Sequence, residues 1–422
     1  MRAPERAGDG PWAPLRARVF RGLWIASVVS NVGTIMHTVG AAWAMTSLTS
    51  SPATVSLAQT AWTVPGFLFA LPAGVFADTL DRRRLIIVTQ LVAMTTAAAL
   101  GALQVAGHLT VPLLLLGTFL LSVALTLSAP AFMALIPDLV PDEQLPQAIG
   151  LNAIAYNGSQ SLGPALAGVL IALSGPGAVF LVNAASFLGI VMVLRNYRPR
   201  ASAEPVHEGA LQAMRNGVQY FRESPSLRRY ALRIMLAFTV TSALTALLPL
   251  LARERLHTTP AQFGMLSTAL GVGAVTAIWV MPRARRVAGP DAVVAAAGVL
   301  WAAGAALLAT THTLGLAALS LLLTGGAAMA TMNSVYSLFM AQLPAWVRGR
   351  ASSVVMLVVW LGASAGAYGW GALASGVGIP TALLASSGAQ LLVTAVAFVV
   401  LRLAPAPGVP RPAEPARTTF ER

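Results

Sequence analysis

Twelve long apolar runs constrain the fold of this chain more than any other feature. They lie at about 23–47, 54–77, 85–106, 111–135, 147–173, 177–195, 229–252, 261–281, 292–310, 314–341, 351–374 and 379–402. About 20 apolar residues are needed to cross a bilayer as a helix, because every backbone polar group in hydrocarbon must be paired within the segment. Only 10% of the residues are charged, against roughly 25% in soluble domains. We therefore expect an all-α polytopic membrane protein with twelve transmembrane helices, and the composition excludes an ordinary soluble enzyme.

The distribution of arginine predicts the orientation. The chain has 27 basic residues, all of them Arg. With twelve spans, all except Arg253 and Arg255 fall on the side of the N-terminus. Positively charged loops mark the cytoplasmic side of a membrane protein. We expect a bacterial inner (plasma) membrane protein with both termini in the cytoplasm, and the net charge of +13 then reflects topology rather than nucleic-acid binding.

The sequence repeats itself at a spacing of about 205 residues. Phe-Met-Ala at 132–134 recurs at 339–341, and His108 corresponds to His312 in the matching turn. Parallel repeats of this kind place a substrate path at the interface of two bundles. The expected division is a cytoplasmic segment at 1–22, a six-helix bundle at 23–195, a cytoplasmic linker with an amphipathic helix at 196–228, a second six-helix bundle at 229–402 and a disordered cytoplasmic tail at 403–422. A simple tether is the alternative for the linker.

A charged motif closes the second apolar run. Gly74 and Asp78 end the run, and Arg82 and Arg83 follow it. A carboxylate at a membrane edge can accept from a neighbouring helix N-terminus and can pair with Arg. The motif is therefore a candidate conformational switch that latches helices in one state and releases them in another. The alternative is that its arginines serve only as topology anchors.

This motif resembles the loop motif of the major facilitator superfamily, although Thr79 and Asp81 replace two of its usual residues. The segment 135–145 resembles the branch of that superfamily that contains enterobactin exporters and macrolide-efflux proteins. The resemblance implies two six-helix bundles that alternate access to a central site, with drug:proton antiport as the activity.

A second motif lies in the fifth run, where Gly163, Pro164 and Gly168 resemble the antiporter motif of the same superfamily. Proline kinks a helix, and small residues allow a neighbouring helix to approach closely. We expect this segment to shape the contact between the bundles. An ordinary helix kink is the alternative.

Polar, aromatic and methionine side chains at helical spacing predict the wall of a substrate cavity, because such surfaces adapt to large, partly apolar ligands. The candidates are Asn31, Thr34, Gln59, Trp62, Asn152, Tyr156, Gln160, Asn333, Tyr336, Met340, Trp360 and Tyr368. Hydrogen bonding between helices is the alternative for each of them taken alone.

His37 is the only ionisable residue near the middle of a predicted span. An imidazole titrates near physiological pH and is less costly to bury than a permanent charge. His37 is therefore the candidate proton carrier, and a neutral histidine bonded to a neighbouring helix is the alternative. The spans lack the carboxylates that usually carry protons, and residues 113–135 lack the Arg found there in related proton antiporters. Proton coupling thus rests on the resemblance.

We expect an exporter of a small amphiphilic molecule such as a drug, siderophore or secondary metabolite, which acts as a monomer with protons as coupling ion and membrane lipids as surroundings. A lipid or lysophospholipid translocator and a secondary importer are the alternatives. The sequence has no lysine for a nucleotide-binding loop, no metal-ligand spacing and no nucleophile–base pair. We therefore expect no cofactor, no metal and no enzymatic activity.

Overall fold

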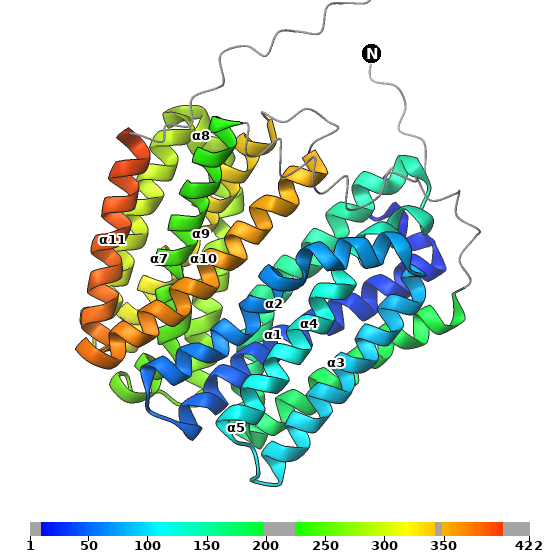
Figure 1. Cartoon of the computed structure of the whole chain (residues 1–422), viewed down its shortest axis with the longest axis horizontal. Helices are drawn as coiled ribbons and strands as arrows, with labels where there is room; N and C mark the ends of the chain where they lie inside the picture. The colour runs from blue at the N-terminus through cyan, green and yellow to red at the C-terminus, as the bar shows by residue number, and fades with distance from the viewer. Residues whose placement is uncertain (1–9, 198–223, 342–347, 400–422) are drawn as a thin grey trace, which may run out of the picture.

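The computed structural model describes residues 10–197, 224–341 and 348–399, and these residues form helices without any strand (Figure 1). The α-helices are α1 (Arg18–Leu48), α2 (Pro52–Thr79), α3 (Arg82–Val105), α4 (Val111–Leu135), α5 (Leu145–Asn196), α7 (Pro225–Leu250), α8 (Pro260–Thr310), α9 (Leu314–Ala341), α10 (Arg348–Val377) and α11 (Ile379–Val399). Short turns of other helix types are η1 (Ala13–Arg16), η2 (Ile136–Asp138), η3 (Asp142–Gln144) and η4 (Leu251–Arg255), of which η4 is a π-helix. The prediction of an all-α membrane fold is confirmed.

The first half of α5 runs parallel to α1. Near the start of both helices, the indole Nε1 of Trp24 donates a hydrogen bond to the carbonyl oxygen of Leu151, 3.0 Å away. Farther along both, a Cβ on Gly163 would lie 2.6 Å from Cγ2 of Ile35. The residue numbers rise together along this contact, so the two segments point the same way.

The second half of α5 runs back along α1 in the opposite direction. A Cβ on Gly40 would lie 3.2 Å from Val179, and one on Gly22 would lie 3.4 Å from Val193. Between the halves, Gly175 has φ 78° and ψ 171°, a conformation that glycine adopts without steric cost. The chain therefore reverses at Gly175, and each half of α5 is long enough to cross a bilayer.

Length and composition identify eleven candidate membrane spans among the described residues. One of them, Asp142–Asn196, has 55 residues and contains the reversal at Gly175. The predicted count of twelve crossings is not confirmed by this count, and it remains a prediction that the reversal supports. In α8 a similar break at Gly289, with φ 75°, already separates two of the eleven spans.

The helices form two groups, α1–α5 and α7–α11 (Figure 1). We call the end of the molecule where α1 begins and α11 ends the terminal end, and the opposite end, with the turn between α1 and α2, the turn end. In Figure 1 the groups lie against each other at the turn end and diverge toward the terminal end.

Contacts along α2 agree with this arrangement. At its start, the backbone N–H of Ala53 donates to Oγ of Ser375 in α10, 3.0 Å away. Farther along, a Cβ on Gly66 would lie 2.7 Å from the ring of Trp360. No hydrogen bond or ion pair joins the described residues of α2 beyond Gly66 to the second group, so the groups are closed against each other over the first half of α2 only.

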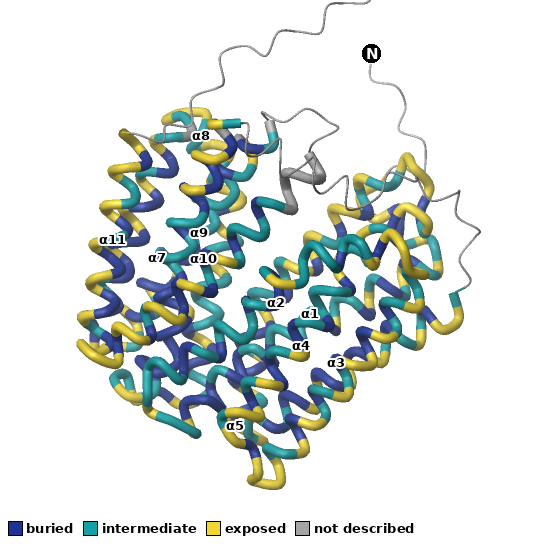
Figure 2. The backbone as a smooth tube through the Cα atoms, viewed as in Figure 1, coloured by how far each residue is buried: buried dark blue, intermediate teal, exposed yellow. Residues whose placement is uncertain are grey.

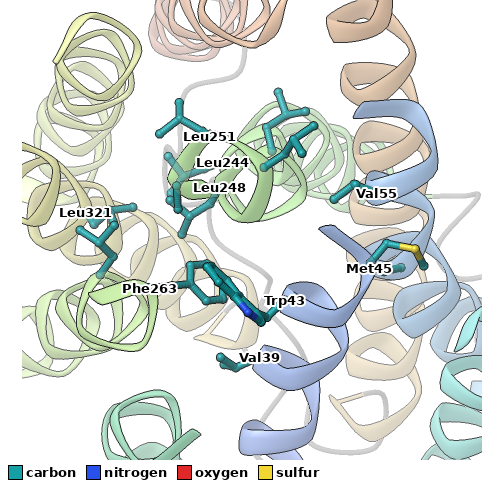
Figure 3. Close-up of a cluster of buried hydrophobic side chains, with 14 of the residues drawn as sticks. Val39, Trp43, Met45, Val55, Leu244, Leu248, Leu251, Phe263 and Leu321 are labelled. Atoms are coloured by element: carbon teal, nitrogen blue, oxygen red, sulfur yellow. The ribbon is translucent and has the colours of Figure 1, made fainter. Parts of the chain in front are cut away.

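The largest buried cluster spans both groups near the turn end (Figures 2 and 3). Trp43 of α1 and Phe263 of α8 stack with ring centroids 5.4 Å apart, and Val55 of α2 and Leu248 of α7 belong to the same cluster. Lipid tails are as apolar as these side chains, so close packing rather than exclusion of water holds membrane helices together. The cluster therefore marks where the groups fit most closely.

Two helices extend beyond the apolar runs that predicted them. α1 begins at Arg18, before the run at 23–47, and the first part of α8 continues to Gly289, past the run at 261–281. Arginines do not end a helix, since their long stems reach from the membrane edge toward water. The predicted amphipathic linker helix and the predicted disordered tail fall on residues 198–223 and 400–422, which lie outside the described residues.

Candidate functional site

A small, partly open recess lies between the groups. It is lined from the first group by His37 of α1, Gln59 and Trp62 of α2 and Thr118 of α4, and from the second group by Thr245 of α7. The rest of its wall is alanine, valine, threonine and proline, and no charged side chain of the described residues lines it. We call it the central recess. Its wall suits a mainly apolar molecule with a few hydrogen-bonding groups.

His37 is completely buried at the edge of the central recess. Its ring lies 4.6 Å from the ring of Phe180 in α5, centroid to centroid. Neither ring nitrogen has a hydrogen-bond partner among the described residues. The alternative of a histidine bonded to a neighbouring helix therefore has no support here. Buried polar atoms nearly always find a partner, so the two nitrogens are available to a water molecule, a proton or a ligand.

Thr118 and Thr245 are functional candidates that the sequence analysis missed. The Thr118 hydroxyl is buried without a partner in the part of the chain that the structure describes. Thr245 donates to the carbonyl of Ser242 at 3.1 Å and keeps its oxygen free to accept. Single threonines in apolar helices are common, and the sequence does not tell which of them face another helix. Only the packing of α4 and α7 around the recess identifies these two.

The antiporter-like motif lies at the contact between α5 and α8. A Cβ on Gly168 would lie 2.8 Å from Cα of Gly264, and a Cβ on Gly264 would lie 2.6 Å from the carbonyl oxygen of Pro164. Gly163 instead packs against Ile35 within the first group. The two backbones thus approach so closely that no side chain fits between them, and the motif is part of the contact between the groups.

Two further predicted cavity residues lie at this same interface rather than in the central recess. Trp360 packs against Gly66, and a Cβ on Gly271 of α8 would lie 2.6 Å from the carbonyl oxygen of Gln160. The Gln160 side chain donates to the hydroxyl of Tyr156, 3.1 Å away. Their observed role in this conformation is packing and hydrogen bonding.

The remaining predicted cavity residues do not line the central recess. The guanidinium of Arg285 donates to Oδ1 of Asn333 at 2.5 Å, so Asn333 joins α9 to α8. Tyr336 and Met340 pack against a buried apolar cluster of the second group, and Tyr368 is half exposed. Asn31, Thr34 and Asn152 are partly buried on α1 and α5.

The switch motif spans the turn between α2 and α3 at the terminal end. Arg82 pairs with Asp138 at 3.6 Å and donates to the carbonyl of Ala134 at 3.2 Å. Arg83 donates to the carbonyls of Leu194 and Arg195 at 2.6 and 2.7 Å. These carbonyls end the second half of α5, where a cation is favourable because the helix dipole is negative there.

Asp78 and Gly74 make fewer contacts than the arginines of the switch motif. Asp78 is exposed and has no ion pair or hydrogen bond among the described residues, and no atom lies within 4 Å of a Cβ built on Gly74. The side of α2 at the terminal end thus has space for a partner. The arginines hold the first group together, while Asp78 is available for a contact that this conformation lacks.

The sequence profile of the family described as "transmembrane secretion effector" matches residues 9–411. Among curated relatives, the staphyloferrin A transporter of Staphylococcus aureus is 24% identical over 298 residues, which are 70% of this chain and 74% of that protein. Macrolide efflux protein A of Streptococcus pyogenes is 22% identical over 260 residues, 60% of this chain and 64% of that protein. The match thus spans somewhat less than two thirds of the macrolide efflux protein.

Solved structures agree on the fold. A bacterial homologue of the lysosomal transporter Spinster, in an inward-facing and occupied conformation, superposes with a TM-score of 0.74 at 15% identity and covers 91% of this chain and 96% of its own. A bacterial homologue of the iron transporter ferroportin, in an inward-facing state, gives a TM-score of 0.73 at 17% identity over 90% and 98%. At this identity the likeness concerns the fold alone. By its profile match and its fold, this chain belongs to the transmembrane secretion effector family of major facilitator superfamily transporters.

Proposed function

We propose that this transporter is a secondary active exporter of a small amphiphilic molecule, which it carries by alternating access of the central recess to the two sides of the membrane. The observation that carries the proposal is the position of the recess. It lies between the two groups of helices, which are closed at the turn end and diverge toward the terminal end. A site between two rocking bundles is what alternating access requires.

The orientation rests on arginine. Among the described residues, the terminal end carries Arg82, Arg83 and Arg285, and the turn end carries only Arg253 and Arg255. Basic residues favour the cytoplasmic side, so the terminal end faces the cytoplasm and the present conformation is open inward. Export is supported by the likeness to a macrolide efflux protein and by the antiporter-like motif at the contact between α5 and α8.

The proposed substrate is neutral or weakly charged, since the part of the chain that the structure describes places no charged side chain in the wall of the central recess. Unpartnered hydrogen-bonding atoms on His37 and Thr118 suit a molecule with a few polar groups on an apolar body. The proposed coupling ion is the proton, carried by His37, the only ionisable residue among the described residues of the recess wall. The proposed working unit is the monomer.

Efflux of a compound panel tests this function. Cells with and without the protein are loaded with a macrolide, staphyloferrin A and aromatic dyes, and release is followed before and after the proton gradient is collapsed. We expect faster release of at least one compound with the protein present, and loss of that difference without the gradient. Equal release from both kinds of cell would contradict export.

A further inference from the structure

The second group of helices contains a small, partly open recess of its own. It is enclosed by α7, α8, α9 and α11, with Phe238 and Trp301 as aromatic walls and Gln390 of α11 as its most polar member. No residue of the first group lines it. We call it the C-terminal recess.

Gln390 leaves one hydrogen-bonding atom of this recess unsatisfied. The side chain is 4% exposed, and its Nε2 donates to Oγ1 of Thr394 at 3.4 Å. Its Oε1 is buried without a hydrogen-bond partner among the described residues. An amide oxygen out of water and without a donor destabilises the structure that holds it, which is a reason to look for a ligand that supplies the donor.

A hydroxyl on the α7 side of the recess, that of Thr241, is likewise available as a hydrogen-bond acceptor. Thr241 gives its proton to the carbonyl of Ala237 at 2.8 Å, so its oxygen retains lone pairs only. On its α7 and α11 sides the C-terminal recess therefore offers acceptors beside aromatic walls. Its chemical complement is an apolar or aromatic body that carries an O–H or N–H donor.

The C-terminal recess and the central recess are neighbours along α7. Thr241 lines the first and Thr245 lines the second. Residues four apart lie on the same face of a helix, about 6 Å apart along its axis. The two recesses thus lie about one helical turn apart along α7.

We propose that the C-terminal recess is a second subsite for the transported molecule, which accepts a donor-bearing apolar end while the rest of the molecule occupies the central recess. This inference rests on the proposed function for the identity of its ligand. It also narrows the substrate class to elongated amphiphiles with a hydroxyl or amine at an apolar end. A molecule held by both groups of helices binds differently when the groups rock, and such differential binding is what shifts a conformational equilibrium.

The test uses two probes that differ by one donor, 2-naphthol and its methyl ether 2-methoxynaphthalene. Their binding to the full chain in lipid nanodiscs is measured by quenching of tryptophan fluorescence. Gln390→Leu is expected to weaken the binding of 2-naphthol about five- to tenfold, which corresponds to the loss of one hydrogen bond. The binding of the ether should not change. The matched control is Gln90→Leu, because Gln90 of α3 is equally buried with an unpartnered oxygen but lines neither recess.

Two further variants keep the test decisive. Ala328→Phe fills the C-terminal recess and is expected to abolish binding of both probes. Thr241→Val removes one acceptor without changing the size of the side chain. It should weaken the binding of 2-naphthol selectively, and it keeps the test available if Gln390→Leu does not fold. Equal weakening of both probes by Gln390→Leu, an equal effect of Gln90→Leu, or binding that survives Ala328→Phe would overturn the subsite. Binding needs no proton gradient, so loss of export with intact binding would contradict the proposed function alone.

Discussion

Arg253 joins the two groups of helices at the turn end, where its Nη1 donates to Oγ1 of Thr46, 3.1 Å away. The same guanidinium lies 5.6 Å from the ring centroid of Trp43. Arg255, two residues later, bonds instead to the carbonyl of Ala309 and to His312 within its own group. Of the two arginines at this end, one therefore crosses between the groups and one does not.

Removal of Arg253 should favour the conformation that is open at the turn end. A partly buried cation–π contact and a charged hydrogen bond together contribute about 1–3 kcal/mol, so we expect Arg253→Gln to shift the equilibrium about five- to a hundredfold. Spin labels on Val105→Cys and Thr313→Cys report the turn-end distance, and the native chain has no cysteine to interfere. Arg255→Gln is the matched control. Equal shifts in both variants would show that Arg253 does not act between the groups.

A single methyl group at Gly168 should prevent closure of the turn end. The added Cβ would meet the Gly264 backbone at 2.8 Å, and a backbone cannot move aside as a flexible side chain can. Gly168→Ala is therefore expected to populate the conformation open at the turn end and to reduce transport at least tenfold. Gly158→Ala on the same helix gains the same helix propensity, about 1 kcal/mol, but meets nothing within 4 Å. Its spin-label distances and transport should match those of the unmodified protein.

His37→Gln should abolish transport driven by a proton gradient and leave expression intact, because glutamine cannot take up the proton. His108→Gln, in the exposed turn after α3, should have no effect. His37→Leu tests whether the effect of replacing His37 on transport arises from a loss of stability. It removes two buried unpartnered nitrogens, so its thermal midpoint should not fall below that of the unmodified protein. Unchanged gradient-driven transport in His37→Gln would exclude this residue as proton carrier.

Substitutions at Asp78 and Asp81 should have different effects on the transport rate and on the free energy of unfolding. Asp81 accepts from the backbone N–H of Arg84 at 2.9 Å and caps α3, so Asp81→Ala should lower the free energy of unfolding by about 1 kcal/mol. Asp78 has no ion pair or hydrogen bond with the described residues in this conformation, so Asp78→Ala should leave stability unchanged while it lowers the transport rate. Thermal unfolding in nanodiscs and transport assays on the same preparations measure both quantities. A loss of stability in Asp78→Ala equal to that in Asp81→Ala would contradict a switching role.

Most of the fold could be predicted from the sequence, because a bilayer requires long helices of one kind. The predicted runs at 111–135 and 314–341 coincide with α4 and α9. The site was harder to predict. His37, Gln59 and Trp62 do line the central recess, but Asn333 binds Arg285 and Tyr368 is half exposed. Periodicity shows which residues share a face of one helix, whereas the neighbour of that face is set by packing between segments far apart in the chain.

Gln390 is a residue whose importance could not be predicted from the sequence. It is one amide in the last predicted span, and the sequence gives it no partner motif. Its significance comes from the unpartnered Oε1 and from aromatic walls that α7 and α8 contribute. Four helices together form this site, and the sequence of no single one of them contains a motif that would predict it.

The most direct test of export by alternating access is substrate accumulation in inside-out membrane vesicles with an imposed proton gradient, acidic inside. The compound panel includes a macrolide and staphyloferrin A. We predict saturable, gradient-dependent accumulation of at least one compound with the unmodified protein and with Gly158→Ala, and its loss with Gly168→Ala. Absence of gradient-dependent accumulation for every compound, or undiminished accumulation with Gly168→Ala, would contradict the account.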